Sequence, residues 1–314
     1  MVKKNVLELF SGTHSWGKEL HKKFNVVSLD RDIGGECPLK SGYKSDTHIQ
    51  EDILTWDYKV YKPNHFYLIT ASPVCSMWSN LRNTWIGRKL KEHGDTIITK
   101  EILQQDIDNY GKPMVDKMIE IIEYFKPKYY VIENPHSSKM RHYIDEAYPN
   151  YASKCAIASY CKYSDWGYEK KTRFWTNIPY TPLICKKDCD NIITIKTQKG
   201  AIHKGKKILI KGTTRTLHKN PIGDTNKAVD DDQKIHKERM GTTKTVMVDG
   251  QIIRVNTKAL REKYKDHVNL QIGKKELKKN KHNKNMSTDV GGGNNRLERY
   301  RIPSDLIKEF INLI

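Results

Sequence analysis

Short apolar runs alternate with helical segments over residues 5 to 178, and this alternation constrains the fold more than any other feature of the sequence. In the segment from 113 to 125, apolar residues recur at helical spacing, and Pro127 ends that helix. The strand-like runs are Val6–Phe10, Val26–Asp30, Phe66–Thr70, Tyr129–Ile132 and Arg173–Asn177. Such alternation is typical of an α/β fold, in which helices cover both faces of a mostly parallel sheet. Ligands of such folds bind where the strands end.

Positive charge is concentrated in one third of the chain. The formal net charge is +19, and residues 186 to 285 hold 26 Lys and Arg against 11 Asp and Glu, which accounts for +15 of it. A solvated lysine-rich surface would explain a modest excess, but not one gathered in a single region. We therefore expect this region to contact the phosphates of a nucleic acid.

The composition changes after Pro182, where apolar runs become short and lysine, threonine, asparagine and glycine dominate. We therefore predict a catalytic domain over 1–182, a small basic region over 183–290, and a C-terminal helix over 291–314 that docks back on the first domain. Brief strands are expected at 192–195, 208–210 and 246–248. Exposed loops are expected at Asp230–Asp232 and at 274–285, and Gly291–Gly293 is a predicted hinge.

No apolar stretch approaches the roughly 20 residues that cross a bilayer, and the N-terminus lacks the apolar core of a signal peptide. We expect a soluble intracellular protein with reduced cysteines. Cys185 and Cys189 could hold zinc, but no second close pair completes the usual set of four ligands. The sequence therefore predicts no metal site.

Two features favour a nucleoside-containing cofactor. The first is the turn after the first strand, where small residues around Gly12 let backbone N–H groups approach a ligand. The second is Asp30, which ends the second strand 18 residues later, where a carboxylate commonly binds ribose hydroxyls. Asp52 could accept a hydrogen bond from an adenine amino group, or it could simply cap a turn.

Three further segments carry candidate catalytic residues. Cys75 follows a strand in the loop Ser72-Pro73-Val74-Cys75, with lysines and arginines beyond, where a thiol pKa could be lowered. A lone cysteine after a strand is also often an inert buried residue. Glu133 ends a buried strand, where partial desolvation suits a proton donor. Glu169, Lys171 and Arg173 alternate onto one face of an extended strand, pointing into a cleft or into water.

Taken in order, these motifs resemble the DNA cytosine-5 methyltransferase family. Leu9-Phe10-Ser11-Gly12 stands where the family has Asp-Leu-Phe-Ala-Gly, and Pro73-Val74-Cys75-Ser76 stands where it has Pro-Pro-Cys-Gln. Glu133-Asn134-Pro135 is similar to Glu-Asn-Val, and Glu169, Lys171 and Arg173 fall on Gln-x-Arg-x-Arg. The phrases Ala71–Cys75 and Tyr160–Tyr168 look closest to the divergent branch of bacteriophages and large DNA viruses.

The resemblance implies a Rossmann-like class I domain that binds S-adenosyl-L-methionine and acts, as a monomer, on double-stranded DNA. A target cytosine would be flipped out of the stack, and the Cys75 thiolate would add to its carbon 6. Glu133 would hydrogen-bond ring nitrogen 3, while Arg173, assisted by Lys171, would orient the base. Residues 77 to 106, with Arg82, Arg88, Lys89 and Lys91, would form a mobile loop over the base. The implied cofactor pocket is lined by Phe10, Ser11, Gly12, Thr13, Trp16, Asp30, Asp52, Ile53 and Pro73.

The sequence departs from the family pattern at several positions. His14 and Ser15 replace two glycines, and Val74 replaces a proline. The family's arginine-rich ninth motif is not found, and Arg296–Arg301 is the candidate to replace it. Three other functions are open: an amino-methyltransferase, which needs no thiol; a catalytically silent DNA-binding protein; and an RNA cytosine-5 enzyme, which would need Cys161 as a second cysteine.

Overall fold

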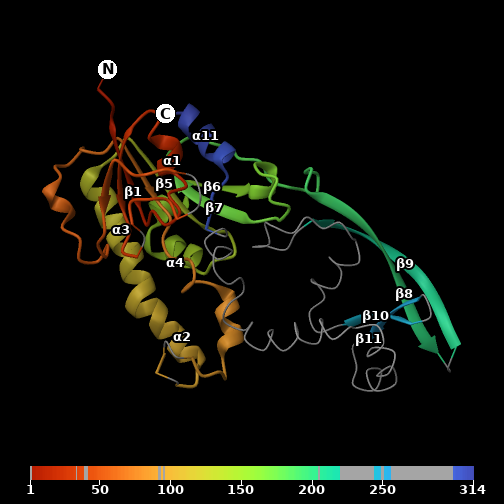
Figure 1. Cartoon of the computed structure of the whole chain (residues 1–314). Helices are drawn as coiled ribbons and strands as arrows, with labels where there is room; N and C mark the ends of the chain where they lie inside the picture. The colour runs from red at the N-terminus through yellow and green to blue at the C-terminus, as the bar shows by residue number, and fades with distance from the viewer. Residues whose placement is uncertain are drawn as a thin grey trace. The chain divides into compact units, whose positions relative to one another are not determined.

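A computed structural model of the chain describes residues 2–32, 34–38, 42–90, 93–94, 96–203, 206–219, 244–248, 251–255 and 300–314 (Figure 1). The chain divides into two compact units. The first unit comprises Met1–Ser164, Glu169–Cys185 and Tyr300–Ile314, and the second comprises Asp165–Tyr168 and Lys186–Arg299. The change of unit falls at Cys185, three residues beyond the boundary predicted at 182.

The first unit is built on a seven-stranded sheet of order β3-β2-β1-β4-β5-β7-β6. Its strands are β1 (Asn5–Leu9), β2 (Asn25–Leu29), β3 (Thr47–Ile49), β4 (Leu68–Ala71), β5 (Tyr129–Pro135), β6 (Cys155–Ser159) and β7 (Lys171–Thr176). Neighbours from β3 to β5 pair in parallel, and β7 runs antiparallel to both β5 and β6. The mostly parallel α/β sheet predicted from the alternation is confirmed.

Helices cover both faces of this sheet. The amphipathic α3 (Lys112–Phe125) packs its apolar face, including Val115 and Ile122, into the main core together with α4 (Met140–Ala147) and α5 (Pro149–Ala152). On the other face, α1 (Gly17–Leu20) lies beside α11 (Ser304–Asn312), as Figure 1 shows. Neighbouring residues of β7 divide between the faces: Trp175 belongs to the main core, whereas Phe174 contacts Phe310 of α11.

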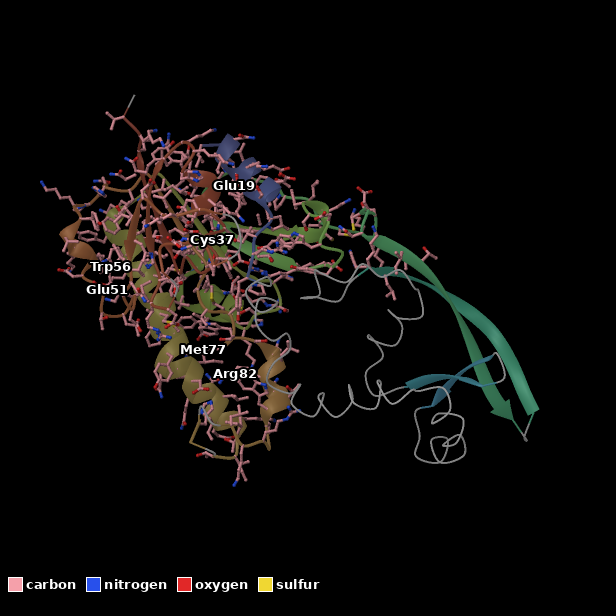
Figure 2. The ribbon with its side chains drawn as sticks, in the orientation of Figure 1. Glu19, Cys37, Glu51, Trp56, Met77 and Arg82 are labelled. Atoms are coloured by element: carbon pink, nitrogen blue, oxygen red, sulfur yellow. The ribbon has the colours of Figure 1, made fainter. Side chains whose placement is uncertain are left out.

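The segment after Cys75 is a folded substructure that the sequence analysis treated as a loop. It contains the 3-10 helix η2 (Asn80–Trp85) and the helix α2 (Lys100–Asp106), and Leu90, Ile98 and Leu103 form a small apolar cluster between them. Arg82, labelled in Figure 2, is buried in an ion pair with Asp106. Its charge is therefore not directed toward solvent, in contrast to exposed Arg88 and Lys89, while Lys91 lies outside the described residues.

The second unit contains two antiparallel hairpins. Strand β8 (Ile192–His203) pairs with β9 (Lys206–His218), and β10 (Lys244–Val248) pairs with β11 (Gln251–Val255). The brief strands predicted after residue 182 fall within β8, β9 and β10. The predictions for Asp230–Asp232, for 274–285, for Gly291–Gly293 and for most of Arg296–Arg301 lie outside the described residues.

The described residues also contain three short helical turns: η1 (Tyr58–Val60), η4 (Ile107–Gly111) and η5 (Tyr160–Lys162). Within the part of the chain that the structure describes, no helix has both the length and the apolar character needed to span a bilayer.

Candidate active site

The turn that follows β1 is tightly wound and meets the end of β2. Phe10, Gly12 and His14 all have positive φ, at 55°, 48° and 50°, which is uncommon for residues other than glycine. The Gly12 N–H donates to Asp30 Oδ2 at 2.9 Å, so the two predicted cofactor residues lie together where β1 and β2 end. This geometry forms a backbone cradle beside a carboxylate.

Glu8 of β1 also holds this turn, although its role was not predicted from the sequence. Its side chain is 3% exposed, and Oε1 accepts hydrogen bonds from the N–H groups of Trp16 at 3.1 Å and Gly17 at 3.0 Å. Oε2 lies 3.4 Å from His14 Nδ1. The sequence did contain a signal for this role, since Glu8 is the single charged residue in the apolar run Val6–Phe10. A carboxylate that is buried with such a strand must be paired with hydrogen-bond donors.

The other predicted cofactor residues surround the turn in different ways. Ser11 and Thr13 are buried, and Thr13 Oγ1 lies 3.0 Å from Ser15 Oγ. Trp16 packs edge-on against Phe310 of α11, with ring centroids 5.5 Å apart. Asp52 accepts a hydrogen bond from the Leu54 N–H at 3.0 Å, which is the turn-capping alternative, and Oδ2 lies 3.4 Å from Arg31. Ile53 is part of the main core.

The cysteine loop is anchored to β5. The side-chain amide of Asn134 donates to the Pro73 carbonyl at 3.0 Å, so the middle residue of Glu133-Asn134-Pro135 holds the residue two before Cys75. Burial raises the pKa of the Cys75 thiol, the nearby charge of Lys170 lowers it, and that of Glu133 raises it, with a net increase. The expectation of a lowered thiol pKa is therefore wrong, because burial outweighs the effect of the Lys170 charge.

Glu133 is held by two groups that sequence analysis did not single out. It is 6% exposed, and Oε1 accepts a hydrogen bond from the Tyr160 hydroxyl at 3.0 Å. The Lys170 ammonium lies 3.8 Å from the same oxygen and 4.9 Å from the centre of the Tyr160 ring. The carboxylate thus has a fixed orientation and a cationic neighbour, and that cation also acts on the Cys75 thiol.

The register of β7 decides which residues share the face of Glu133. Glu133 pairs with Phe174, and Asn134 pairs with Arg173, so Arg173 lies on the opposite face from Glu133. The Arg173 guanidinium is 3.9 Å from Asp145 of α4, and exposed Lys171 is 3.6 Å from Glu169.

Residues 169, 171 and 173, which were predicted to share one face, therefore do not lie on the face of Glu133. Lys170 lies beside Glu133 instead. The reason is that alternation defines two sets of residues, and only the pairing with β5 decides which set faces the site. Thr172, also on the Glu133 face, is fully buried, and its hydroxyl has no hydrogen-bond partner among the described residues.

No protein-family model matches the chain. A curated relative does: a probable DNA (cytosine-5)-methyltransferase of Frog virus 3 is 37% identical over 191 residues, which make up 60% of this chain and 78% of the relative. The chain belongs to the DNA (cytosine-5)-methyltransferase family. The resemblance of the motifs is thereby confirmed at the level of the family.

Solved structures show weaker likeness to this DNA (cytosine-5)-methyltransferase. The DNMT2 of Spodoptera frugiperda is 12% identical with a TM-score of 0.35, covering 58% of this chain and 56% of that one. The Entamoeba histolytica methyltransferase EhMeth is 15% identical with a TM-score of 0.36, covering 55% and 53%. The chain thus spans about half the length of these solved proteins.

One departure from the motifs of DNA (cytosine-5)-methyltransferases has a structural explanation. His14 replaces a glycine yet keeps a positive φ, and its side chain is fully buried. One ring nitrogen faces Glu8, and the other lies 2.9 Å from the Gly34 carbonyl in the loop after β2. The imidazole therefore offsets the backbone strain by joining the turn after β1 to that loop.

Proposed function

We propose that the protein transfers a methyl group from S-adenosyl-L-methionine to carbon 5 of cytosine in DNA, through a covalent bond between Cys75 and the base. The observation that carries this proposal is the grouping of a thiol, a buried carboxylate and an ammonium group: Cys75, Glu133 and Lys170 act on one another at the carboxyl ends of β4 and β5. An amino-methyltransferase would need neither the thiol nor its link to the carboxylate.

The turn after β1 fits the cofactor. Ser11 Oγ is buried and has no hydrogen-bond partner among the described residues, and three left-handed residues turn the backbone sharply beside it. Asp30 would bind the ribose hydroxyls, since each carboxylate oxygen has two lone pairs and can accept more than the bond from Gly12. Ser11, Gly12 and Thr13 would hold the amino-acid end, and S-adenosyl-L-methionine, when bound, supplies an electrophilic methyl group.

The chain's own groups account for the activation of the base. The Cys75 thiol loses its proton to water, and the sulfur adds to carbon 6 of a flipped-out cytosine, which places an electron pair at carbon 5. Protonated Glu133 donates to ring nitrogen 3 and stabilises the negative charge there, an electrostatic effect that is strong in a buried site. After methylation, loss of the carbon 5 proton to a base restores the double bond and expels the Cys75 thiolate.

Lys170 takes the place that the resemblance gave to Lys171 and Arg173. It is the cation that acts on both Glu133 and Cys75, and its side chain is 12% exposed. Arg173 lies on the opposite face of β7, and we expect it to support the structure there through its ion pair with Asp145 of α4. We further expect double-stranded DNA as the partner, with the basic second unit contributing phosphate contacts; that the enzyme is a soluble monomer stays a prediction.

DNA that carries 5-fluorocytosine tests the covalent step, because fluorine at carbon 5 cannot leave as a cation and the adduct persists. Wild-type protein with the cofactor should form a complex that survives denaturing electrophoresis, and Cys75→Ser should form none. Cys155→Ser, at an exposed cysteine on β6, is the matched control and should keep the adduct. An adduct in Cys75→Ser, or methylation found on an exocyclic nitrogen instead of carbon 5, contradicts the proposal.

A further inference from the structure

Two cysteines that the proposed reaction does not use lie together in the first unit. Cys161 of η5 is 3% exposed and Cys185 is 6% exposed, and their sulfur atoms are within 4.8 Å of each other. A backbone hydrogen bond of 3.0 Å from the Ser159 N–H to the Leu183 carbonyl joins the segments two residues before each cysteine. The fold thus holds two buried thiols at the spacing of ligands to a common ion.

A second pair of ligands lies in the second unit, at the base of the β8–β9 hairpin. Cys189 Sγ and a ring nitrogen of His218 are within 4.8 Å of each other, and His218 is 5% exposed. His218 is the cross-strand partner of Ile192, whose N–H donates to the Cys189 carbonyl at 3.1 Å. The Lys219 N–H donates to the Asn191 carbonyl at 2.9 Å, which fixes the hairpin at this end.

The sequence ties the two pairs together, since only three residues separate Cys185 from Cys189. That separation is within the two to four residues usual between zinc ligands. The intervening turn is sharp: Lys187 has a φ of 65°, a conformation unusual for lysine. Each pair supplies two ligands, and a structural zinc ion takes four.

We propose that Cys161, Cys185, Cys189 and His218 bind one structural zinc ion. Three thiolates and one imidazole are a common ligand set of closed, tetrahedral sites, and no position is left for a reacting water. Binding would release the thiol protons to solvent and stabilise the folded chain. The prediction of no metal site considered only the linear spacing of Cys185 and Cys189; the other two ligands, Cys161 and His218, are distant in sequence and become apparent only from the fold.

Metal analysis of the purified full-length protein tests this site independently of methyl transfer. Protein from zinc-supplemented culture should contain one equivalent of zinc, as measured by inductively coupled plasma mass spectrometry. Cys161→Ser, Cys185→Ser, Cys189→Ser and His218→Gln should each lose most of it. Cys155→Ser is the matched control and should retain the full equivalent.

Cobalt exchange into the wild-type protein covers the case in which the ligand variants fail to fold. Thiolate-to-cobalt charge transfer and the intense visible bands of a tetrahedral ion are the expected spectrum. A folded wild-type protein without zinc and without this cobalt spectrum overturns the proposal. So does zinc that persists in both Cys189→Ser and His218→Gln, or a disulfide among the three cysteines found by mass spectrometry.

Discussion

Glu133 must keep one oxygen directed at the base, and its neighbours determine whether it can. The Tyr160 hydroxyl donates to Oε1, which leaves Oε2 for the substrate. Tyr160→Phe removes that bond while retaining the ring that packs beside Lys170. Because a hydrogen bond contributes about 0.5–1.5 kcal/mol, kcat should fall about two- to tenfold. Cofactor affinity, measured by calorimetry, should not change, since the residue lies away from the turn after β1.

Tyr58→Phe is a matched control for that substitution. Tyr58 also donates to a glutamate, Glu120, at 2.5 Å, but this pair links η1 to the outer side of α3. Its loss should leave kcat unchanged. A kcat for Tyr160→Phe equal to that of the wild type, in protein that still forms the fluorocytosine adduct, would exclude the positioning role and leave the proposed reaction intact.

The Cys75 thiol offers a test based on pH. Burial raises its pKa, so the thiolate fraction is small at neutral pH and grows as the pH rises toward that pKa. Alkylation of Cys75 by iodoacetamide, followed by peptide mass spectrometry, should therefore accelerate steadily above neutral pH. In Lys170→Met the cation that lowers the pKa is gone, so the rate at a given pH should fall severalfold.

Lys171→Met removes the same charge from the next residue, which is exposed and paired with Glu169, and should leave the alkylation rate unchanged. Equal slowing in both variants would mean that the thiol responds to the overall charge of the molecule and not to Lys170 in particular.

At the scale of the elements, the junction of β1 and α1 leaves no room for added volume. A Cβ atom on Gly17 would lie 2.6 Å from Glu8 Oε2 and 2.7 Å from the Tyr43 hydroxyl oxygen. Gly17→Ala should lower the free energy of unfolding by about 1–3 kcal/mol, as overpacking of a filled site does. Chemical denaturation measures this, and Gly34→Ala, where a Cβ meets nothing within 4 Å, should differ little from the wild type.

The same junction should make stability depend on pH. Burial alone would lower the pKa of His14, but its hydrogen bond and charge interaction with Glu8 raise it above the ordinary 6.5. The pair therefore stabilises the fold fully below pH 6.5 and loses that contribution as the pH rises through the folded-state pKa. His14→Asn, which tolerates a positive φ, should flatten this part of the profile of unfolding free energy against pH. A profile as steep as that of the wild type would rule out His14 as its source.

The elements also show what can be predicted from the sequence. Strands such as β1 and β5, and helix α3, follow from local apolar spacing, and the pairing of Gly12 with Asp30 follows from where parallel strands end. The face of β7 that meets Glu133 does not, because register with β5 is a tertiary property. The roles of Tyr160 and Lys170 could not be predicted either, because Tyr160 lies in the short 3-10 helix η5 and Lys170 is the residue before β7. The buried ion pair of Arg82 with Asp106 likewise could not be predicted, because it depends on how η2 and α2 pack in the segment after Cys75.

At the scale of the whole molecule, charge should govern DNA affinity. The net charge of +19 is concentrated in residues 186 to 285, so binding should release many counterions. The logarithm of the association constant should fall linearly with the logarithm of salt concentration, by about 0.9 per phosphate contacted. Fluorescence anisotropy on a labelled duplex gives the slope, and an affinity insensitive to salt would contradict phosphate contact as the main source of binding.

Helix α11 and the residues just before it complete the packing around the turn after β1. Residues from the last part of the described chain close the turn after β1: the Ile302 N–H donates to Ser15 Oγ at 3.1 Å, and Ser304 Oγ donates to Glu19 at 2.6 Å, near the Glu19 label in Figure 2. Trp16 and Phe174 both pack on Phe310. While the ribosome is still making the basic region, Phe310 has not been synthesised, so Trp16 and Phe174 lack this packing partner. We therefore expect the turn after β1 to reach its packed form only after α11 has been synthesised, later than the basic region.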